Sequence, residues 1–329
     1  MSYLASILRH MKATLNARRS TMQHEIRIEP RGPFSWESAL DVLGNFPPTR
    51  HQGRSASNAV PLTFPLDGSF RPVATALRFE EGVLRGEVAG TDDLEAVERQ
   101  VARIFSLDHD GSNYPAVGER DPAIGRLMSA LPGLRPVCFT SPYETAAWGV
   151  ISQRISMRQA AVIKDRLIAD LGHALRVGDA DVRCFPAPQR LLQLEGVAGL
   201  SQEKVGRLRG VAKAALEGLL DAERLRALGH EAGPASVLAI PGIGPFWSQG
   251  IYLRGCGIVD VFPEEPLSIA ALGEVHGLGD QPDPATVERL AEPYRPFRTW
   301  VSFLLRVSVN RGLVPGVAGR EGAIRQAAR

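Results

Sequence analysis

The sequence predicts an α+β domain followed by a mainly α-helical body. In the first third, runs that alternate apolar and polar residues are separated by Asp67-Gly68 and Glu81-Gly82, two dipeptides typical of β-hairpins. From about residue 120 onward, helix-start signals recur at short intervals and apolar residues have helical spacing. The length of 329 residues is typical of about two domains.

The α+β domain is predicted over residues 23–115. Residues 24–30 alternate as a short strand, and residues 35–46 have a serine cap and an apolar stripe of helical spacing. Residues 61–90 form the alternating runs, and Thr91 is expected to cap a helix whose first turn is acidic. The simplest packing is an antiparallel sheet backed by helices.

The all-α body is predicted over residues 116–312. Five of its helices are predicted to begin at a capping side chain: Ser141, Ser156, Ser201, Asp221 and Asp283. At Ser141 and Ser156, a Glu or Gln three residues later completes a capping box. Further helices are predicted over 189–194, 234–240, 245–255 and 295–310. Short loops join them, as in a helical bundle.

Composition excludes several classes of protein. The chain is 44% hydrophobic and 22% charged, as a globular protein is, and no run approaches the ~20 apolar residues of a membrane span. Three distant cysteines exclude a disulfide framework and a four-cysteine metal site, and they fit a reducing cytoplasm. The seven histidines have no metal-ligand spacing, so neither a metal nor a cofactor is expected.

The charge is unevenly distributed. The chain carries +2 overall, but residues 1–24 and 306–329 each carry +4, which leaves −6 on residues 25–305. A nucleic-acid site on this body must therefore be local. We expect residues 1–22 to be a disordered basic arm rather than a targeting signal, and residues 313–329 to be a basic tail.

A glycine-containing turn between two predicted helices is the main candidate binding feature. It reads Pro241-Gly242-Ile243-Gly244, and Pro245 then begins the next helix. Glycines leave the backbone bare, so the free amides of residues 242–248 are predicted to face one spot and bind a phosphate. On this stretch alone, a helix–helix turn without a ligand is an equally good interpretation.

The order of several blocks resembles the helix–hairpin–helix DNA glycosylase superfamily and, within it, the 3-methyladenine DNA glycosylase II (AlkA) type. The resemblance extends from about residue 70 to 310 and is carried by residues 101–110, 121–127, 131–156, 185–218, 238–255, 260–269 and 294–308. It implies a TATA-box-binding-protein-like N-terminal domain and a helix–hairpin–helix glycosylase body. It also implies a DNA repair enzyme, monomeric and cytoplasmic (nucleoid-associated in a bacterium), that flips a damaged base out of double-stranded DNA.

The resemblance points to an atypical catalytic position. The family uses an aspartate to stabilise positive charge on the sugar, and Pro266 occupies the matching position here. Glu264 and Glu265 immediately precede it, and Glu265 is predicted to cap the helix that Pro266 begins. Glu265 is the candidate replacement; the alternative is that both glutamates only cap a helix. A catalytically inactive DNA-damage-binding protein is therefore the second hypothesis for function.

The base pocket that the resemblance implies also differs from the family pattern. Phe246 stands where bifunctional members have a nucleophilic lysine, so hydrolysis by water alone is expected. Phe246 also retains one of the family's aromatic positions, whereas two others are Gly250 and Arg306. Gly250 could open space, and Arg306 would repel a cationic base but hydrogen-bond a neutral one. Trp148 is a further candidate for the pocket.

Two adjacent residues between predicted helices match the family's wedge, which fills the gap left by a flipped base. They are Gln153 and Arg154, and a guanidinium at this position could stack on the orphaned partner base. A solvated helix-end arginine is the alternative interpretation.

Overall fold

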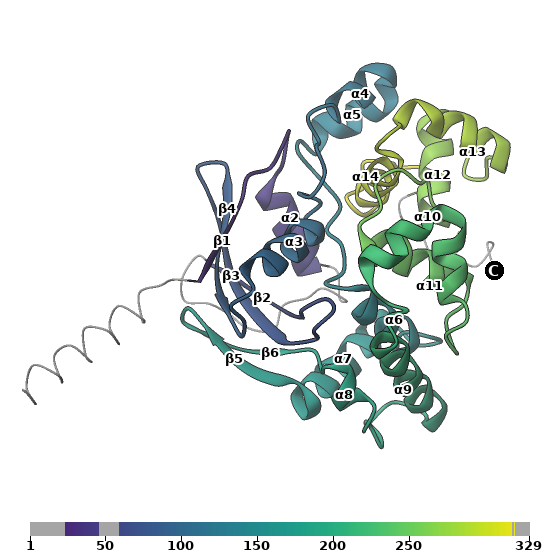
Figure 1. Ribbon diagram of the computed structural model, residues 1–329. Helices are drawn as coiled ribbons and strands as arrows, with labels where there is room; N and C mark the ends of the chain where they lie inside the picture. The colour runs from purple at the N-terminus through teal and green to yellow at the C-terminus, as the bar shows by residue number, and fades with distance from the viewer. Residues whose placement is uncertain (1–23, 46–58, 318, 320–329) are drawn as a thin grey trace, which may run out of the picture.

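The computed structural model describes residues 24–45, 59–317 and 319 (Figure 1). Its first part contains β1 (Glu25–Ile28), α2 (Trp36–Asn45), β2 (Val60–Pro65), β3 (Pro72–Glu80), β4 (Val83–Ala89) and α3 (Leu94–Ile104). Next come α4 (Pro115–Arg120), α5 (Pro122–Ala130), α6 (Pro142–Ile151), α7 (Met157–Leu171), β5 (His173–Val177), β6 (Ala180–Cys184), α8 (Pro188–Leu191) and α9 (Gln202–Leu216). The last elements are α10 (Ala222–Val237), α11 (Pro245–Gly250), η2 (Ile251–Gly255), α12 (Pro266–Val275), α13 (Pro284–Ala291), η3 (Glu292–Tyr294) and α14 (Arg298–Asn310).

The predicted antiparallel sheet is confirmed. Its four strands have the order β1-β4-β3-β2, and each neighbouring pair is antiparallel. Val73 and Leu77 of β3 join the hydrophobic cluster that contains α2 and α3. Ala74 and Ala76 of the same strand belong to a separate cluster. Because side chains alternate along a strand, the two clusters lie on opposite faces of the sheet.

A second antiparallel pair, β5–β6, covers the face opposite α2 and α3. Val177, Ala180 and Val182 pack there, and the hairpin runs along the sheet (Figure 1). The expectation of helix almost throughout the body was wrong for this segment. The signal was present as residues that alternate on either side of Gly178, which has the positive φ of a tight turn (φ 55°).

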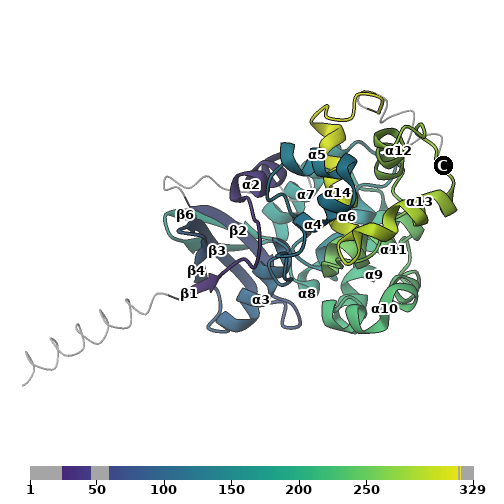
Figure 2. The same cartoon turned by 90° about the horizontal axis from the view of Figure 1, so that it is seen from above.

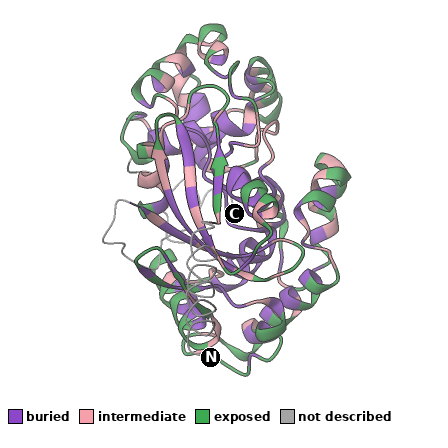
Figure 3. Cartoon of the chain, turned by 60° about the vertical axis from the view of Figure 1, so that its left-hand side comes forward, coloured by how far each residue is buried: buried purple, intermediate pink, exposed green. Residues whose placement is uncertain are grey.

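The helical body has two hydrophobic clusters. Helices α6, α7, α9 and α10, with α11 and η2, bury their apolar faces in one cluster. Helices α4, α5, α12 and α14 contribute to the other, in which Trp300 is 1% exposed. Figure 2 shows the sheet beside this helical part, and Figure 3 shows that the buried residues continue from one part to the other. The division into two domains at residue 115 stays a prediction.

Most of the predicted helix starts are confirmed. The side chains of Ser141, Ser156, Ser201, Asp221 and Asp283 accept hydrogen bonds from first-turn amides. The capping box at Ser156 is complete, because Gln159 also accepts from the Ser156 amide. At Ser141 only half of the box forms, since the Glu144 carboxylate instead pairs with Lys164 and accepts from Thr140.

Two helix boundaries differ from expectation. Asp93 caps α3, and Thr91 instead accepts from the Asp93 amide at 3.1 Å. The helix expected from residue 234 is present as the second part of α10, but it begins earlier, because the non-helical Gly229 (φ 77°, ψ −175°) separates it from the part that Asp221 caps. The predicted arm over residues 1–22 lies outside the described residues, as does most of the basic tail over 313–329.

Candidate functional site

The turn between α10 and α11 has the bare backbone that its glycines predict. Gly242 has φ 91°, a conformation that favours glycine. Gly244 is exposed, and a Cβ built on it would meet no atom within 4 Å. Gly244 caps α11 with no side-chain hydrogen bond, so no side chain of the described residues caps the first-turn amides of this helix. Pro241 is exposed beside them.

Two amides expected to be free are used within the chain. The amide of Ile243 donates to the Ile240 carbonyl at 3.0 Å, and the Ile243 side chain is buried in the core. The amide of Ser248 donates to the Gly244 carbonyl at 2.9 Å, the first hydrogen bond of α11. Fewer backbone amides of residues 242–248 are therefore available to a ligand than the sequence predicted.

The fold brings the α6–α7 loop against this turn. The Gln153 side-chain amide donates to the Gly242 carbonyl at 2.5 Å, across 89 residues of sequence. Arg154 is exposed and has φ 57°, an uncommon backbone conformation for a residue other than glycine. Lys204 and Arg207 of α9 also contact Gln153. Burial and the neighbouring guanidinium groups of Arg207 and Arg154 lower the pKa of Lys204, so three cations lie close together.

The predicted position of Glu265 is confirmed, and its carboxylate has further partners. Pro266 begins α12, and Glu265 Oε2 accepts from the amide and from the hydroxyl of Ser268, both at 2.8 Å. Oε1 accepts from Arg306 Nη1 of α14 at 2.8 Å. The neighbouring Glu264 is exposed. Glu265 is therefore the carboxylate that is held in a fixed orientation.

Arg306 also lines a cavity of about 390 Å³, so Glu265 lies directly behind the wall of this cavity. Residues of α2 and α14 form most of the lining, and Arg254 of η2 completes it. Burial lowers the pKa of Arg254, whose guanidinium lies 4.9 Å from the ring centroid of Phe303. The cavity therefore has an apolar ring, the three guanidinium groups of Arg254, Arg306 and Arg311, and the carboxylate of Asp41 in its wall.

The other expected pocket residues lie elsewhere. Phe246 is 59% exposed on α11 and packs edge-on against Trp247. The space beside Gly250 is filled, because a Cβ there would lie 3.3 Å from the Trp247 ring. Trp148 is 1% exposed in the hydrophobic core. None of these three lines the cavity beside Arg306.

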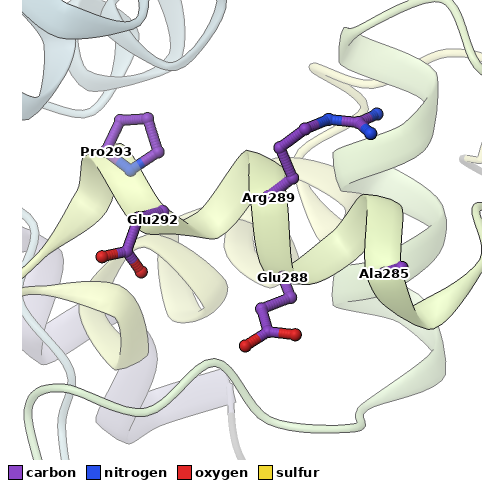
Figure 4. A pocket seen from close by; sticks show the side chains of 5 residues that line it. All are labelled: Ala285, Glu288, Arg289, Glu292 and Pro293. Atoms are coloured by element: carbon purple, nitrogen blue, oxygen red, sulfur yellow. The ribbon is translucent and has the colours of Figure 1, made fainter.

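A second depression lies on α13 and η3. Its lining is Ala285, Glu288, Arg289, Glu292 and Pro293. Figure 4 shows that these side chains point in different directions along the helix rather than converging on one point. We assign no ligand to it.

No protein-family model matches the chain. Among curated proteins, it is 20% identical over 216 residues to the DNA-3-methyladenine glycosylase of Bacillus subtilis. This match covers 64% of this chain and 71% of that protein. It is 30% identical over 202 residues to DNA-3-methyladenine glycosylase 2 of Escherichia coli, a match that covers 60% of this chain and 67% of the relative. The chain belongs to the DNA-3-methyladenine glycosylase family.

Solved structures show that this family member has the glycosylase fold. A 3-methyladenine DNA glycosylase from Archaeoglobus fulgidus superposes with a TM-score of 0.70 at 22% identity, over 86% of this chain and 97% of the other. An 8-oxoguanine glycosylase/lyase from Clostridium acetobutylicum superposes with a TM-score of 0.62 at 13% identity, over 85% and 93%. The relationship to the Escherichia coli enzyme, together with this shared fold, confirms the helix–hairpin–helix glycosylase superfamily that the sequence resembles.

Two negative findings apply to the described part of the chain. No cluster of three or more His, Cys, Asp or Glu side chains there could hold a metal ion. No helix of residues 24–45, 59–317 and 319 is long and apolar enough to cross a membrane.

Sequence reasoning missed the most connected residues of the site. Lys204 and Arg207 both hold the loop that carries Arg154, a role that their positions along the sequence do not indicate. Arg254 carried no signal, because only tertiary packing places it in the cavity wall. The partnership of Arg306 with Glu265 joins residues 41 positions apart and is likewise invisible in local spacing.

Proposed function

We propose that this chain is a monofunctional base-excision glycosylase that hydrolyses the N-glycosidic bond of a damaged base flipped out of double-stranded DNA. The observation that carries the proposal is the contact between Glu265 and Arg306, because it joins an oriented carboxylate to a cavity wall. A volume of about 390 Å³ is within the ~300–1,000 Å³ range of small-molecule pockets. The relatives' names supply the reaction class.

In this mechanism the turn holds the DNA and the cavity receives the base. The backbone around Gly242 and Gly244 would bind phosphate through main-chain donors. The exposed Arg154 would fill the gap in the duplex. Double-stranded DNA carrying a damaged base is therefore the proposed partner, and we propose that the protein acts as a monomer.

The chemistry then depends on one carboxylate and a water molecule. As the bond between C1′ and the base nitrogen breaks, positive charge develops on the sugar, and the Glu265 carboxylate would stabilise it. The water oxygen bonds to C1′ and the bond electrons leave with the base. The proton lost by the water passes to the departing nitrogen of a neutral base, or to solvent when a cationic base leaves as a neutral molecule. Phe246 cannot form a Schiff base, so no lyase step accompanies hydrolysis.

In this proposal Glu265 replaces an aspartate whose family position is occupied by Pro266. Proline has no group that could stabilise a cation. As the N-cap of α12, Glu265 is adjacent to that position and is fixed by Ser268. The extra methylene of glutamate relative to aspartate would extend the carboxylate toward the same space.

A second function, damage binding without catalysis, is favoured by the same contacts. Both carboxylate oxygens of Glu265 already have partners, Ser268 on Oε2 and Arg306 on Oε1. A carboxylate neutralised by an ion pair stabilises a nearby cation less than a free one. This candidate predicts salt-dependent duplex binding without release of any base.

Base release from duplexes that carry either alkylated or deaminated bases distinguishes the two functions. We expect Glu265→Gln to lower the rate by roughly 10²–10³-fold, the usual effect of removing one transition-state-stabilising group. Glu264→Gln is the matched control and should keep the wild-type rate, because Glu264 is exposed. Full activity in both variants would exclude this mechanism. Duplex binding with no base release from any lesion would establish the second function.

A further inference from the structure

Gln153 uses both ends of its side-chain amide to join three separate segments. Its Nε2 donates to the Gly242 carbonyl in the α10–α11 turn at 2.5 Å. Its Oε1 accepts from Nη1 of Arg207 on α9 at 2.8 Å. Because a donor and an acceptor are both used, the orientation of the amide is fixed.

The backbone around Gln153 is held from the other side. Lys204 Nζ donates to the carbonyls of Ile151 and Gln153, at 2.8 and 2.6 Å. Directly after the loop, the capping box at Ser156 begins α7. The loop is therefore fixed at the end of α6, at its middle and at the start of α7.

Between these fixed points lies Arg154 in a strained conformation. Its φ of 57° is unfavourable for a residue other than glycine and persists only where the surroundings impose it. The contacts of Gln153 and Lys204 are the surroundings that impose it here. Arg154 is exposed, so its side chain is accessible at the surface of the loop.

Gly242 of the α10–α11 turn packs closely against Arg207, the same residue that hydrogen-bonds to Gln153. A Cβ at Gly242 would lie 2.6 Å from Cδ of Arg207, so the stem of this arginine packs directly on the turn. Arg207 is in turn held by Glu203 through a 2.5 Å ion pair. The bare turn and the strained loop are thus parts of one hydrogen-bonded unit.

We propose that Gln153 is a positioning residue that fixes the wedge Arg154 relative to the phosphate-binding turn. The turn would then bind the DNA backbone at a fixed distance from the position where Arg154 enters the duplex. This inference rests on the proposed function as a DNA-binding protein, but it does not depend on base release. Gln153 itself touches neither the base nor the sugar in this scheme.

The test is a readout of wedge insertion that involves no catalysis. The full chain is titrated into a duplex in which 2-aminopurine lies opposite a tetrahydrofuran abasic analogue, and binding and fluorescence are recorded together. The wild type should change the fluorescence as Arg154 enters the gap. Gln153→Ala and Arg154→Ala should each raise the protein concentration needed for a half-maximal fluorescence change about tenfold. The double variant should need no higher a concentration than either single variant.

Two further variants separate positioning from general support of the fold. Gln153→Glu keeps the acceptor for Arg207 but loses the donor to Gly242, so it should behave like Gln153→Ala. Gln159→Ala is the matched control, because it removes the two hydrogen bonds that the Gln159 side chain accepts in the capping box of the same loop but no contact with the turn. It should leave the fluorescence response unchanged.

Several results would overturn the inference. They are a wild-type response from Gln153→Glu, an equal loss in Gln159→Ala, or additive losses in the Gln153→Ala/Arg154→Ala double variant. A wild type that responds to the duplex but releases no base from any lesion would refute the glycosylase activity and leave the positioning role supported. A wild type that does not bind the duplex would refute both.

Discussion

Substitution of Gly242 tests how tightly the turn is built. In Gly242→Ala the new Cβ would lie 2.6 Å from Arg207 Cδ, and it would also experience the strain of φ 91°. Gly218 offers a matched control, because its φ is 76° and a Cβ there would meet no atom within 4 Å. Gly218→Ala therefore isolates the conformational strain, which is roughly 1–2 kcal/mol.

The extra cost at Gly242 comes from moving Arg207. Displacing this side chain breaks its 2.8 Å hydrogen bond to Gln153, a charge-assisted bond worth roughly 1.5–3 kcal/mol when well shielded. Because Arg207 is only half-buried, we expect the lower part of that range. Gly242→Ala should thus lower the free energy of unfolding by about 1.5 kcal/mol more than Gly218→Ala does.

Urea unfolding of both variants, repeated in an Arg207→Ala background, measures this difference. With Arg207 truncated the clash disappears, so Gly242→Ala should then cost about the same as Gly218→Ala. Duplex binding should weaken in Gly242→Ala and remain normal in Gly218→Ala. If Gly242→Ala cost the same with and without the Arg207 side chain, the fitted contact between α9 and the turn would be refuted.

Two further predictions concern pH and lesion choice. Asp121 accepts from Tyr294 at 2.6 Å and contacts His276 at 2.9 Å; desolvation raises its pKa, but these two partners outweigh it and lower the pKa. The stability it contributes is present above the unfolded pKa of about 3.9 and is lost as pH falls through the lower folded value. Asp121→Asn should thus lower the free energy of unfolding by about 1–3 kcal/mol at pH 7. Urea titrations at pH 2–7 should also show that the free energy of unfolding depends less on pH in this variant than in the wild type. An unchanged pH dependence would contradict this reasoning. Arg306→Met removes a positive charge from the cavity wall, so the release of cationic alkylated bases relative to neutral deaminated ones should rise about tenfold; an unchanged ratio would show that Arg306 does not face the base.

Local physical chemistry made much of the fold predictable. Capping bonds join residues two or three positions apart, so the starts of α6, α7, α9 and α13 can be read from a few letters. The same reasoning places Pro266 at the start of α12 and Glu265 as its N-cap. Ordered blocks along the chain likewise indicate the glycosylase superfamily.

Tertiary contacts decided what the sequence left open. The β5–β6 hairpin is too short to be stable alone, and it forms where Val177 and Val182 can pack on the sheet. The pairing of Gln153 with Gly242 spans 89 residues, and no local rule selects that partner. Whether Glu265 is only a cap or also supports a cavity wall depends on Arg306 from another helix. Short-range bonding thus determined where the helices begin, whereas contacts between distant segments determined which side chains meet, because only the folded chain brings those segments together.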